Sequence, residues 1–398
     1  MKNKEVHKSD KPRLLVTAST FPRWKGDTEP RFVLDLCIAL KEYFDITVLV
    51  PAAPGAKDQE ILEGINIIRY HYFPIHKWET LCYPGAIVPR IKEKKIRIFL
   101  VPFMFIGLWC KLIKILPKYD YVHAHWLIPQ GIIQSFFKKP YIVTGHGGDV
   151  RSLNKRIIKK LKIRCLKKAK KVTVVSDSLR EDVRDLVPTV QADVISMGCN
   201  IDKFDRKFRT ENYFGQGDKK VVLFVGRLAE VKGVSYLIEA MKNVDAKLAI
   251  VGDGPLRQEL EQQAKTLKDK VLFLGSKSHV ELPEIYASAD LFVGPSVTTK
   301  DGQKEGLGLV FLEAMASGLP VIGSNSGGIP EIVKDGVNGF LVEERNTEQL
   351  AQKINMILTS EELNNKFVEY GLRTAIDRDY KNIAKKYANI IHPLREKG

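Results

Sequence analysis

The most chemically distinctive part of this chain is Lys300–Pro320, which carries Glu305 and Glu313 in an E-x7-E pattern. Gly306 and Gly308 lie between the two carboxylates, and a helix that buries apolar side chains is predicted to follow. The first N–H groups of a helix lack intrahelical partners, so a glycine loop that opens a helix favours phosphate binding. Carboxylates accept hydrogen bonds from hydroxyl groups. The stretch therefore predicts a ligand with phosphate and hydroxyl groups, such as a sugar nucleotide.

Two cations give a second signal for phosphate. Arg227 and Lys232 closely follow the apolar run Lys220–Val225, which predicts a buried strand, and Gly226 and Gly233 flank them. Cations at the carboxyl end of a strand, with glycines that permit close approach, suit the charges of a diphosphate. Together with the E-x7-E stretch they predict a diphosphate site.

The order of the predicted elements indicates parallel sheets. Arg13–Ser19 predicts a buried strand, Phe32–Tyr43 a helix and Asp45–Pro51 a second strand. A strand, a helix and a strand in this order form a βαβ unit, in which ligands gather at the carboxyl ends of the strands. Further strands are predicted at Tyr119–His125, Tyr141–Gly145 and Val172–Ser176, and the same rhythm repeats after Lys220.

The length of 398 residues exceeds that of a typical single core, so we expect two α/β domains with the ligand in the cleft between them. We place the first domain at 1–205, the second at 206–378 and a C-terminal helix at 379–398. The polar, glycine-bearing stretch Arg206–Asp218 is the predicted linker.

His146 is the candidate functional residue of the first domain. It follows the predicted strand Tyr141–Gly145 and stands among Gly145, Gly147 and Gly148. Glycines free the backbone around the imidazole, which can then face a cleft. We predict a role in the site for His146, although a lone histidine is more often structural.

The net charge of +16 is confined to the first half of the chain. Residues 1–200 hold 35 Lys and Arg against 19 Asp and Glu, whereas the remaining 198 residues hold 28 of each. A one-sided basic surface indicates an anionic partner. Nucleic acid is disfavoured, because the sequence has no RNA-binding motif and no interleaving of aromatic and basic residues.

Two segments suggest contact with a membrane. Val150–Lys171 contains eleven Lys and Arg and no acidic residue, and its apolar residues are spaced as on one helix face. We predict an anionic membrane surface as its partner, with a solvated helix face as the alternative. Phe99–Trp109 is an apolar run of eleven residues, too short to cross a membrane. It is either a buried helix or, after the basic residues from Arg90 to Arg97, an interfacial segment.

Five scattered cysteines without a CxxC pair indicate free thiols and make a metal site unlikely. The first fourteen residues lack the apolar core of a signal peptide. We therefore expect a cytoplasmic protein, peripheral at the inner face of the cell membrane.

Several motifs in order resemble the retaining glycosyltransferases of family 4, which have the GT-B fold. They are FVGRLAEVKGVSYLIEA, AIVGDGP, VLFLGSKS and EGLGLVFLEAMASGLPVIGSNSGGIPEIVKDGVNGFLV. The resemblance covers nearly all of residues 13–390 and is most specific over 221–342. It implies two Rossmann-like parallel-sheet domains facing a cleft, with the C-terminal helix crossing back to the first domain.

The resemblance also implies roles for individual residues. Arg227 and Lys232 would bind the donor diphosphate, and His146 would face the reacting sugar. Glu305 would lie against the donor sugar with the backbone N–H groups of the residues that follow it, and Glu313 would accept the ribose hydroxyls. The remaining implied donor contacts are Gly252, Gly275, Lys277, Gly306, Leu307 and Gly308.

The implied activity is transfer of a hexosyl unit, with retention, from a nucleotide-diphosphate sugar. UDP is favoured over GDP, and the acceptor is expected to be lipid-linked or a glycan of the cell envelope. The alternative is a small soluble acceptor such as a sugar phosphate. We expect no metal or other cofactor, because the first domain lacks an Asp-x-Asp motif and two cations can neutralise the diphosphate.

Overall fold

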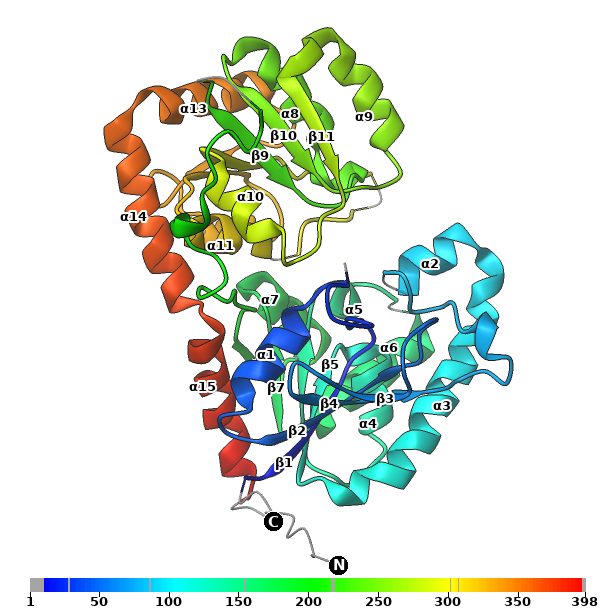
Figure 1. The fold of residues 1–398 in the computed structure, drawn as a ribbon. Coiled ribbons are helices and arrows are strands. Elements are labelled where there is room, and N and C mark those ends of the chain that lie inside the picture. The colour runs from blue at the N-terminus through cyan, green and yellow to red at the C-terminus, as the bar shows by residue number, and fades with distance from the viewer. Residues whose placement is uncertain are drawn as a thin grey trace, which may run out of the picture. The chain divides into compact units, whose positions relative to one another are not determined.

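A computed structural model describes residues 11–27, 29–85, 87–153, 155–215, 219–300, 302–306 and 308–395 (Figure 1). The chain divides into two compact units. One contains the N-terminal part through Ile195 and the C-terminal residues from Ile383, and the other is Ser196–Asn382. Each unit has its own sheet with helices packed against it (Figure 1). The boundary placed after residue 205 in the sequence lies inside the second unit.

The described residues of the first unit form an eight-stranded sheet in the order β3-β4-β2-β1-β5-β6-β7-β8. The strands are β1 (Arg13–Thr17), β2 (Asp45–Pro51), β3 (Gln59–Leu62), β4 (Ile65–Tyr70), β5 (Tyr121–His125), β6 (Tyr141–Gly145), β7 (Lys171–Val174) and β8 (Ala192–Val194). Neighbouring strands pair in parallel, except for the antiparallel hairpin β3–β4 at one edge. The side chains of β5 and β6 are buried, as expected for inner strands covered on both faces.

The helices of the first unit follow the βα rhythm of its strands. They are α1 (Phe32–Leu40), α2 (Ile87–Glu93), α3 (Leu100–Ile115), α4 (Ile132–Gln134), α5 (Gly148–Arg151), α6 (Arg156–Lys168), α7 (Asp177–Leu186) and α15 (Tyr380–Ile391). The C-terminal residues of α15 belong to this unit, where the hydroxyl of Tyr387 lies 3.3 Å from that of Thr144.

The second unit has a six-stranded parallel sheet among its described residues, in the order β11-β10-β9-β12-β13-β14. The strands are β9 (Val221–Val225), β10 (Lys247–Val251), β11 (Val271–Gly275), β12 (Leu291–Gly294), β13 (Val321–Ser324) and β14 (Phe340–Val342). The helices are α8 (Val234–Ala240), α9 (Arg257–Ala264), α10 (Leu282–Ser288), α11 (Leu309–Ala316), α12 (Ile329–Ile332), α13 (Thr347–Thr359) and α14 (Glu361–Asp377).

The parallel α/β architecture predicted from the sequence is confirmed, whereas one element was not foreseen and two local predictions need correction. The hairpin β3–β4 was not predicted. The expected basic helix over 150–171 is two helices, α5 and α6, separated by an extended Ser152. The expected linker Arg206–Asp218 packs on the second unit as far as it is described: Arg209 donates to the carbonyl oxygens of Ala287 and Ala289.

Candidate active site

The strand order of the second sheet creates a crevice beside its central strand. β9 lies between β10 and β12, so the chain leaves β9 towards one side of the sheet and later returns on the other. Ligands of parallel α/β sheets bind at the carboxyl ends of the strands where this reversal occurs. The loop after β9 carries Arg227 and Lys232, and the loop after β12 carries Glu305. The strand order therefore brings the loop with the two cations close to the loop with the carboxylate, although the two loops lie far apart in the sequence.

Lys232 and Glu305 form an ion pair at this point. The Nζ atom of Lys232 lies 2.5 Å from Oε2 of Glu305, and the two side chains are only 21% and 13% exposed. The hydroxyl of Ser296 donates to the same carboxylate oxygen at 3.1 Å, and the Gly306 N–H donates to Oε1 at 3.2 Å. Both oxygens of Glu305 thus have donors that fix the orientation of the carboxylate.

The electrostatics keep Glu305 ionised. Burial raises the pKa of its carboxyl group, but the ammonium group of Lys232 and the hydrogen bonds from Lys232, Ser296 and Gly306 outweigh burial, so the pKa lies below its ordinary value. The site therefore holds a carboxylate and an ammonium group together in a place partly shielded from water.

Glycines let the neighbouring backbone segments approach closely. Gly233 has a φ of 63°, and a Cβ atom there would lie 1.9 Å from the carbonyl oxygen of Pro295, at the end of β12. Gly252 has a φ of 134°, and a Cβ atom there would lie 1.9 Å from the carbonyl oxygen of Gly226. The N–H of Gly252 donates to the carbonyl of Gly275 at 2.8 Å. Gly226, Gly252 and Gly275, at the carboxyl ends of β9, β10 and β11, thus form one row, which contains two of the predicted donor positions, Gly252 and Gly275.

The loop before α11 carries Gly306 and Gly308, two of the predicted donor contacts. Gly308 has left-handed backbone angles and is the N-cap of α11, whereas Gly306 is exposed and a Cβ atom there would meet nothing within 4 Å. α11 buries Phe311, Leu312 and Met315, as predicted. Leu307 lies outside the described residues.

Arg227, Lys277 and Glu313 are not joined to the Lys232–Glu305 pair by any contact found among the described residues. Arg227 is exposed. Lys277 forms an ion pair with Glu281 at 3.1 Å, and Glu313 accepts a hydrogen bond from the hydroxyl of Tyr286 at 2.9 Å. The two carboxylates of the E-x7-E pattern therefore have different partners.

In the first unit, His146 lies directly after β6 in a turn held by Asp149. One carboxylate oxygen of Asp149 accepts from the N–H groups of His146 and Gly147, at 3.0 and 2.9 Å, and the other accepts from the N–H of Leu127 at 2.8 Å. Burial raises the pKa of Asp149, and these N–H groups oppose that effect. Asp149 therefore ties the turn after β6 to the chain segment after β5.

A row of imidazole rings runs inward from His146. Nε2 of His146 lies 3.0 Å from Nδ1 of His125, whose ring contacts that of His123. Burial lowers the pKa of His146 to about 3 and keeps the pKa of His125 far below 6.5. Both rings are therefore neutral near pH 7. Beside them Trp126 has a φ of 72°, a costly angle for a large side chain that is typical of functional sites.

Sequence reasoning missed several residues that build these sites. Ser296 fixes Glu305, and Asp149 fixes the turn of His146. Gly327 approaches the backbone of Glu305 so closely that a Cβ atom would lie 2.2 Å from its carbonyl oxygen. Asp149 and Gly327 lie in the glycine-rich sequences TGHGGD and SNSGG, and that pattern could have indicated these two residues.

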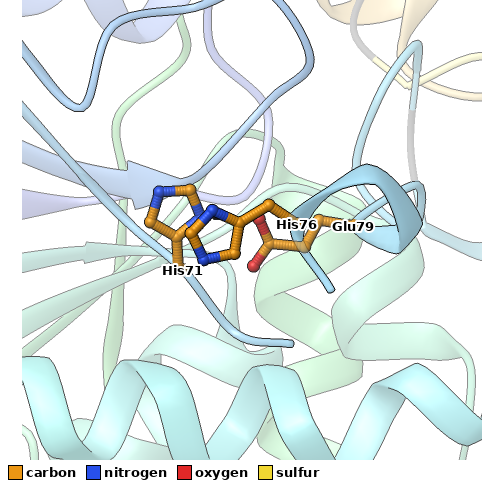
Figure 2. Close-up of side chains that lie close together, drawn as sticks. All are labelled: His71, His76 and Glu79. Atoms are coloured by element: carbon orange, nitrogen blue, oxygen red, sulfur yellow. Dashed lines mark hydrogen bonds and ion pairs between the residues drawn. The ribbon is translucent and has the colours of Figure 1, made fainter. Parts of the chain in front are cut away.

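A separate cluster, of His71, His76 and Glu79, contains residue types that bind metals (Figure 2). His71 contacts Glu79 at 2.7 Å through Nδ1 and Asp58 at 3.0 Å through Nε2. The rings of His71 and His76 are stacked, 3.6 Å apart and inclined by 8°. Parallel stacked rings cannot both direct an in-plane lone pair at one ion. This arrangement fits a protonated His71 between two carboxylates better than a metal centre.

Comparisons with known proteins match one family in each half of the chain. The family "Glycosyl transferases group 1" matches residues 205–374, and "Glycosyltransferase Family 4" matches residues 30–203. N-acetyl-alpha-D-glucosaminyl L-malate synthase of Bacillus anthracis is 31% identical over 334 residues, which are 78% of this chain and 85% of that protein. The GDP-mannose-dependent alpha-(1-6)-phosphatidylinositol monomannoside mannosyltransferase of Mycolicibacterium smegmatis is 35% identical over 183 residues, which are 43% of this chain and 48% of that protein.

Solved structures share the fold over almost the whole chain. Sucrose-phosphate synthase from Thermosynechococcus elongatus has a TM-score of 0.78 at 22% identity and covers 98% of this chain and 100% of its own. Anabaena HepE in complex with UDP and glucose has a TM-score of 0.73 at 21% identity, with 96% and 100% covered. The chain is a glycosyltransferase with the GT-B fold. It belongs to the group 1 glycosyltransferases, family 4.

Proposed function

We propose that this enzyme transfers a hexosyl unit, with retention of anomeric configuration, from a nucleotide-diphosphate sugar. The observation that carries the proposal is the Lys232–Glu305 pair at the switch point of the second sheet, next to the glycine turn that opens α11. Cations, a helix N-terminus and a fixed carboxylate match the diphosphate and the hydroxyls of a donor sugar.

The proposed chemistry uses only these protein groups and the substrates. The bond between the anomeric carbon and the diphosphate oxygen breaks, and the acceptor oxygen bonds to that carbon from the same face. The acceptor proton passes to a phosphate oxygen of the leaving nucleotide. Arg227 and Lys232 stabilise the negative charge that develops on the diphosphate, and Glu305 holds Lys232 and the sugar in place. His146, as a neutral ring, is proposed to contact the reacting sugar.

UDP is the proposed nucleotide, with GDP as the alternative. HepE, which shares the fold, was solved with UDP and glucose, whereas the mycobacterial relative is named for its dependence on GDP-mannose. Thermal-shift measurements with UDP, GDP and ADP sugars separate these possibilities, because a bound donor stabilises the folded state by mass action. A shift with none of the three would contradict the donor assignment.

The proposed acceptor is lipid-linked or a glycan, and the enzyme is proposed to act as a peripheral protein at the inner face of the cell membrane. The basic surface of α6 supports this location. A soluble sugar phosphate is the alternative acceptor, and the basic first unit would then bind its phosphate. Incubation of the enzyme and labelled donor with lipid extracts or with sugar phosphates distinguishes the two.

Retention and site assignment have direct tests. The anomeric configuration of the product, read by NMR coupling constants, should equal that of the donor. Arg227→Ala is expected to reduce transfer about a hundredfold or more, since it removes a charge from the leaving diphosphate. The matched control Lys242→Ala removes an exposed lysine paired with Glu239 and should leave the rate unchanged. Inversion, or normal turnover in Arg227→Ala, would contradict the mechanism.

A further inference from the structure

The apolar segment in the first unit is longer than its sequence suggested. Lys95–Lys118 is one continuous helical segment of 24 residues, long and apolar enough by composition to cross a membrane. One face of it, however, belongs to the core: Met104, Leu108 and Leu112 are almost fully buried. Gly107 lies against the backbone of His71 and Tyr72, where a Cβ atom would come within 2.9 Å. A spanning orientation would require this packed face to leave the domain.

The opposite face carries exposed apolar side chains at helical spacing. We call this set the α3 stripe: Ile96, Phe99, Phe103, Ile106, Cys110 and Ile113. Phe99 is 72% exposed and Ile106 is 59% exposed. Phe103 also contacts Phe73, which stacks with the exposed Trp78. The spacing of three and four residues places the stripe on one side of a helix that is buried on its other side.

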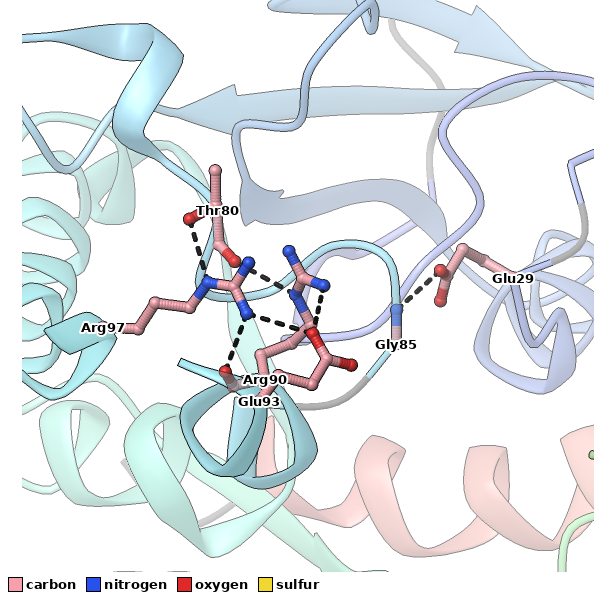
Figure 3. A network of polar contacts seen from close by, with 6 residues as sticks. All are labelled: Glu29, Thr80, Gly85, Arg90, Glu93 and Arg97. Atoms are coloured by element: carbon pink, nitrogen blue, oxygen red, sulfur yellow. Dashed lines mark hydrogen bonds and ion pairs between the residues drawn. The ribbon is translucent and has the colours of Figure 1, made fainter. Parts of the chain in front are cut away.

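A polar network fixes the segment that leads into this helix (Figure 3). The guanidinium group of Arg97 donates to the Thr80 hydroxyl at 3.2 Å and to the carboxylate of Glu93 at 3.1 Å. Arg90 pairs with the same carboxylate at 2.6 Å. Arg90 and Arg97 are therefore largely buried structural residues. The exposed basic residues at this end of the stripe are Lys92, Lys94 and Lys95.

Helix α3, which carries the α3 stripe, and the basic helix α6 both contact Phe136. Trp109 on α3 contacts Phe136 at a ring distance of 5.3 Å, and the guanidinium of Arg164 on α6 lies 4.6 Å from the ring of Phe136. The exposed basic residues of α6 are Arg156, Lys159, Lys160, Arg164, Lys167 and Lys168, whereas Lys162 is buried and donates to backbone carbonyls. Exposed apolar and basic side chains of this unit therefore adjoin at Phe136, which is 43% exposed.

We propose that the α3 stripe inserts into the interfacial region of an anionic lipid bilayer while the lysines of α6 contact its headgroups. An apolar face flanked by cations suits anionic lipid, which offers hydrocarbon and negative charge at adjacent depths. A second copy of this chain fits less well, because a twofold interface would bring the flanking lysines of both copies together. The inference deepens the proposed peripheral location and does not depend on the sugar transferred.

The test is sedimentation of the full chain with vesicles of phosphatidylglycerol and phosphatidylcholine, compared with phosphatidylcholine alone. Phe99→Ser/Ile106→Ser should weaken binding about tenfold or more at low and high salt. Lys159→Gln/Lys160→Gln should weaken it about fivefold per lysine at low salt and little at high salt. The matched control Ile61→Ser removes a 72% exposed isoleucine from the edge strand β3 and should bind normally.

Cys110 reports insertion directly. The other four cysteines are buried, so a membrane-impermeant maleimide should react with Cys110 and should be blocked by anionic vesicles. Unprotected Cys110 on bound vesicles, or normal binding by the Phe99→Ser/Ile106→Ser variant, would overturn the proposal. A dimer detected by sedimentation velocity would also overturn the proposal if the same substitutions dissociated it. An unchanged circular dichroism melting curve shows that a variant has not misfolded. An unchanged thermal shift on addition of donor sugar shows that a change in membrane binding is separate from failure of the proposed activity.

Discussion

Lys232 and Glu305 lie 73 positions apart in the chain, yet their charged groups are 2.5 Å apart at the carboxyl edge of the second sheet. Each side chain is partly withdrawn from water, and the opposite charge beside it compensates for the hydration that each group loses. The ammonium group that is proposed to meet the donor diphosphate is thereby positioned before the donor arrives.

Glu305→Gln is expected to lower the transfer rate about a hundredfold or more and also to lower the free energy of unfolding, because it leaves the Lys232 ammonium without its carboxylate. Adding Lys232→Met should recover stability, since both charges are then gone, but it should not recover activity. Steady-state kinetics and urea unfolding measure the two effects separately. A stable single variant would contradict the structural role, and a fully active double variant would contradict the catalytic one.

Two glycines of the same site should respond differently to alanine. Gly252→Ala places a Cβ atom 1.9 Å from the Gly226 carbonyl oxygen at a φ of 134°, so we expect a loss of at least ~2 kcal/mol in unfolding free energy. Gly306→Ala meets nothing within 4 Å and should leave the melting temperature unchanged while it weakens donor binding. Denaturant unfolding and donor titrations of both variants check the pair; equal stability of the two would contradict the close approach at Gly252.

His71 should make stability depend on pH. Burial lowers its pKa, but Glu79 and Asp58 outweigh burial and raise the pKa above 6.5. A group whose pKa is raised on folding stabilises the protein below its unfolded pKa and loses that contribution as the pH rises through its folded pKa. His71→Gln should therefore lower the melting temperature more at about pH 5.5 than at about pH 9. The same loss at both values would show that His71 acts by packing with His76 and not by charge.

Turnover should not require a divalent cation, because Arg227 and Lys232 are proposed to neutralise the leaving diphosphate. The rate measured in excess EDTA is expected to equal the rate in buffer. Loss of turnover with EDTA that Mg²⁺ restores would contradict the proposal.

Zn²⁺ titration of the wild type and of His76→Ala tests the His71 cluster separately, and no change in either melting curve is expected.

The strands were predictable because parallel strands buried on both faces are short apolar runs bounded by glycine. Asp45–Pro51 and Tyr141–Gly145 have the predicted bounds. The hairpin β3–β4 was missed because an edge strand such as Gln59–Leu62 is short, half polar and largely exposed, so it lacks that pattern. The break between α5 and α6 was missed because helical spacing of the apolar residues continues through it.

The sequence alone determined the chemistry that is available: two cations and two carboxylates beside glycines, and a basic first half. Only the tertiary structure decided how these groups pair. Strand order brought Lys232 to Glu305 and left Glu313 to Tyr286. Packing buried one face of α3 and exposed the other, which no local pattern distinguishes in a segment that is apolar on all sides. Pairing and exposure depend on contacts between residues distant in the chain, and those contacts form only when the sheets assemble.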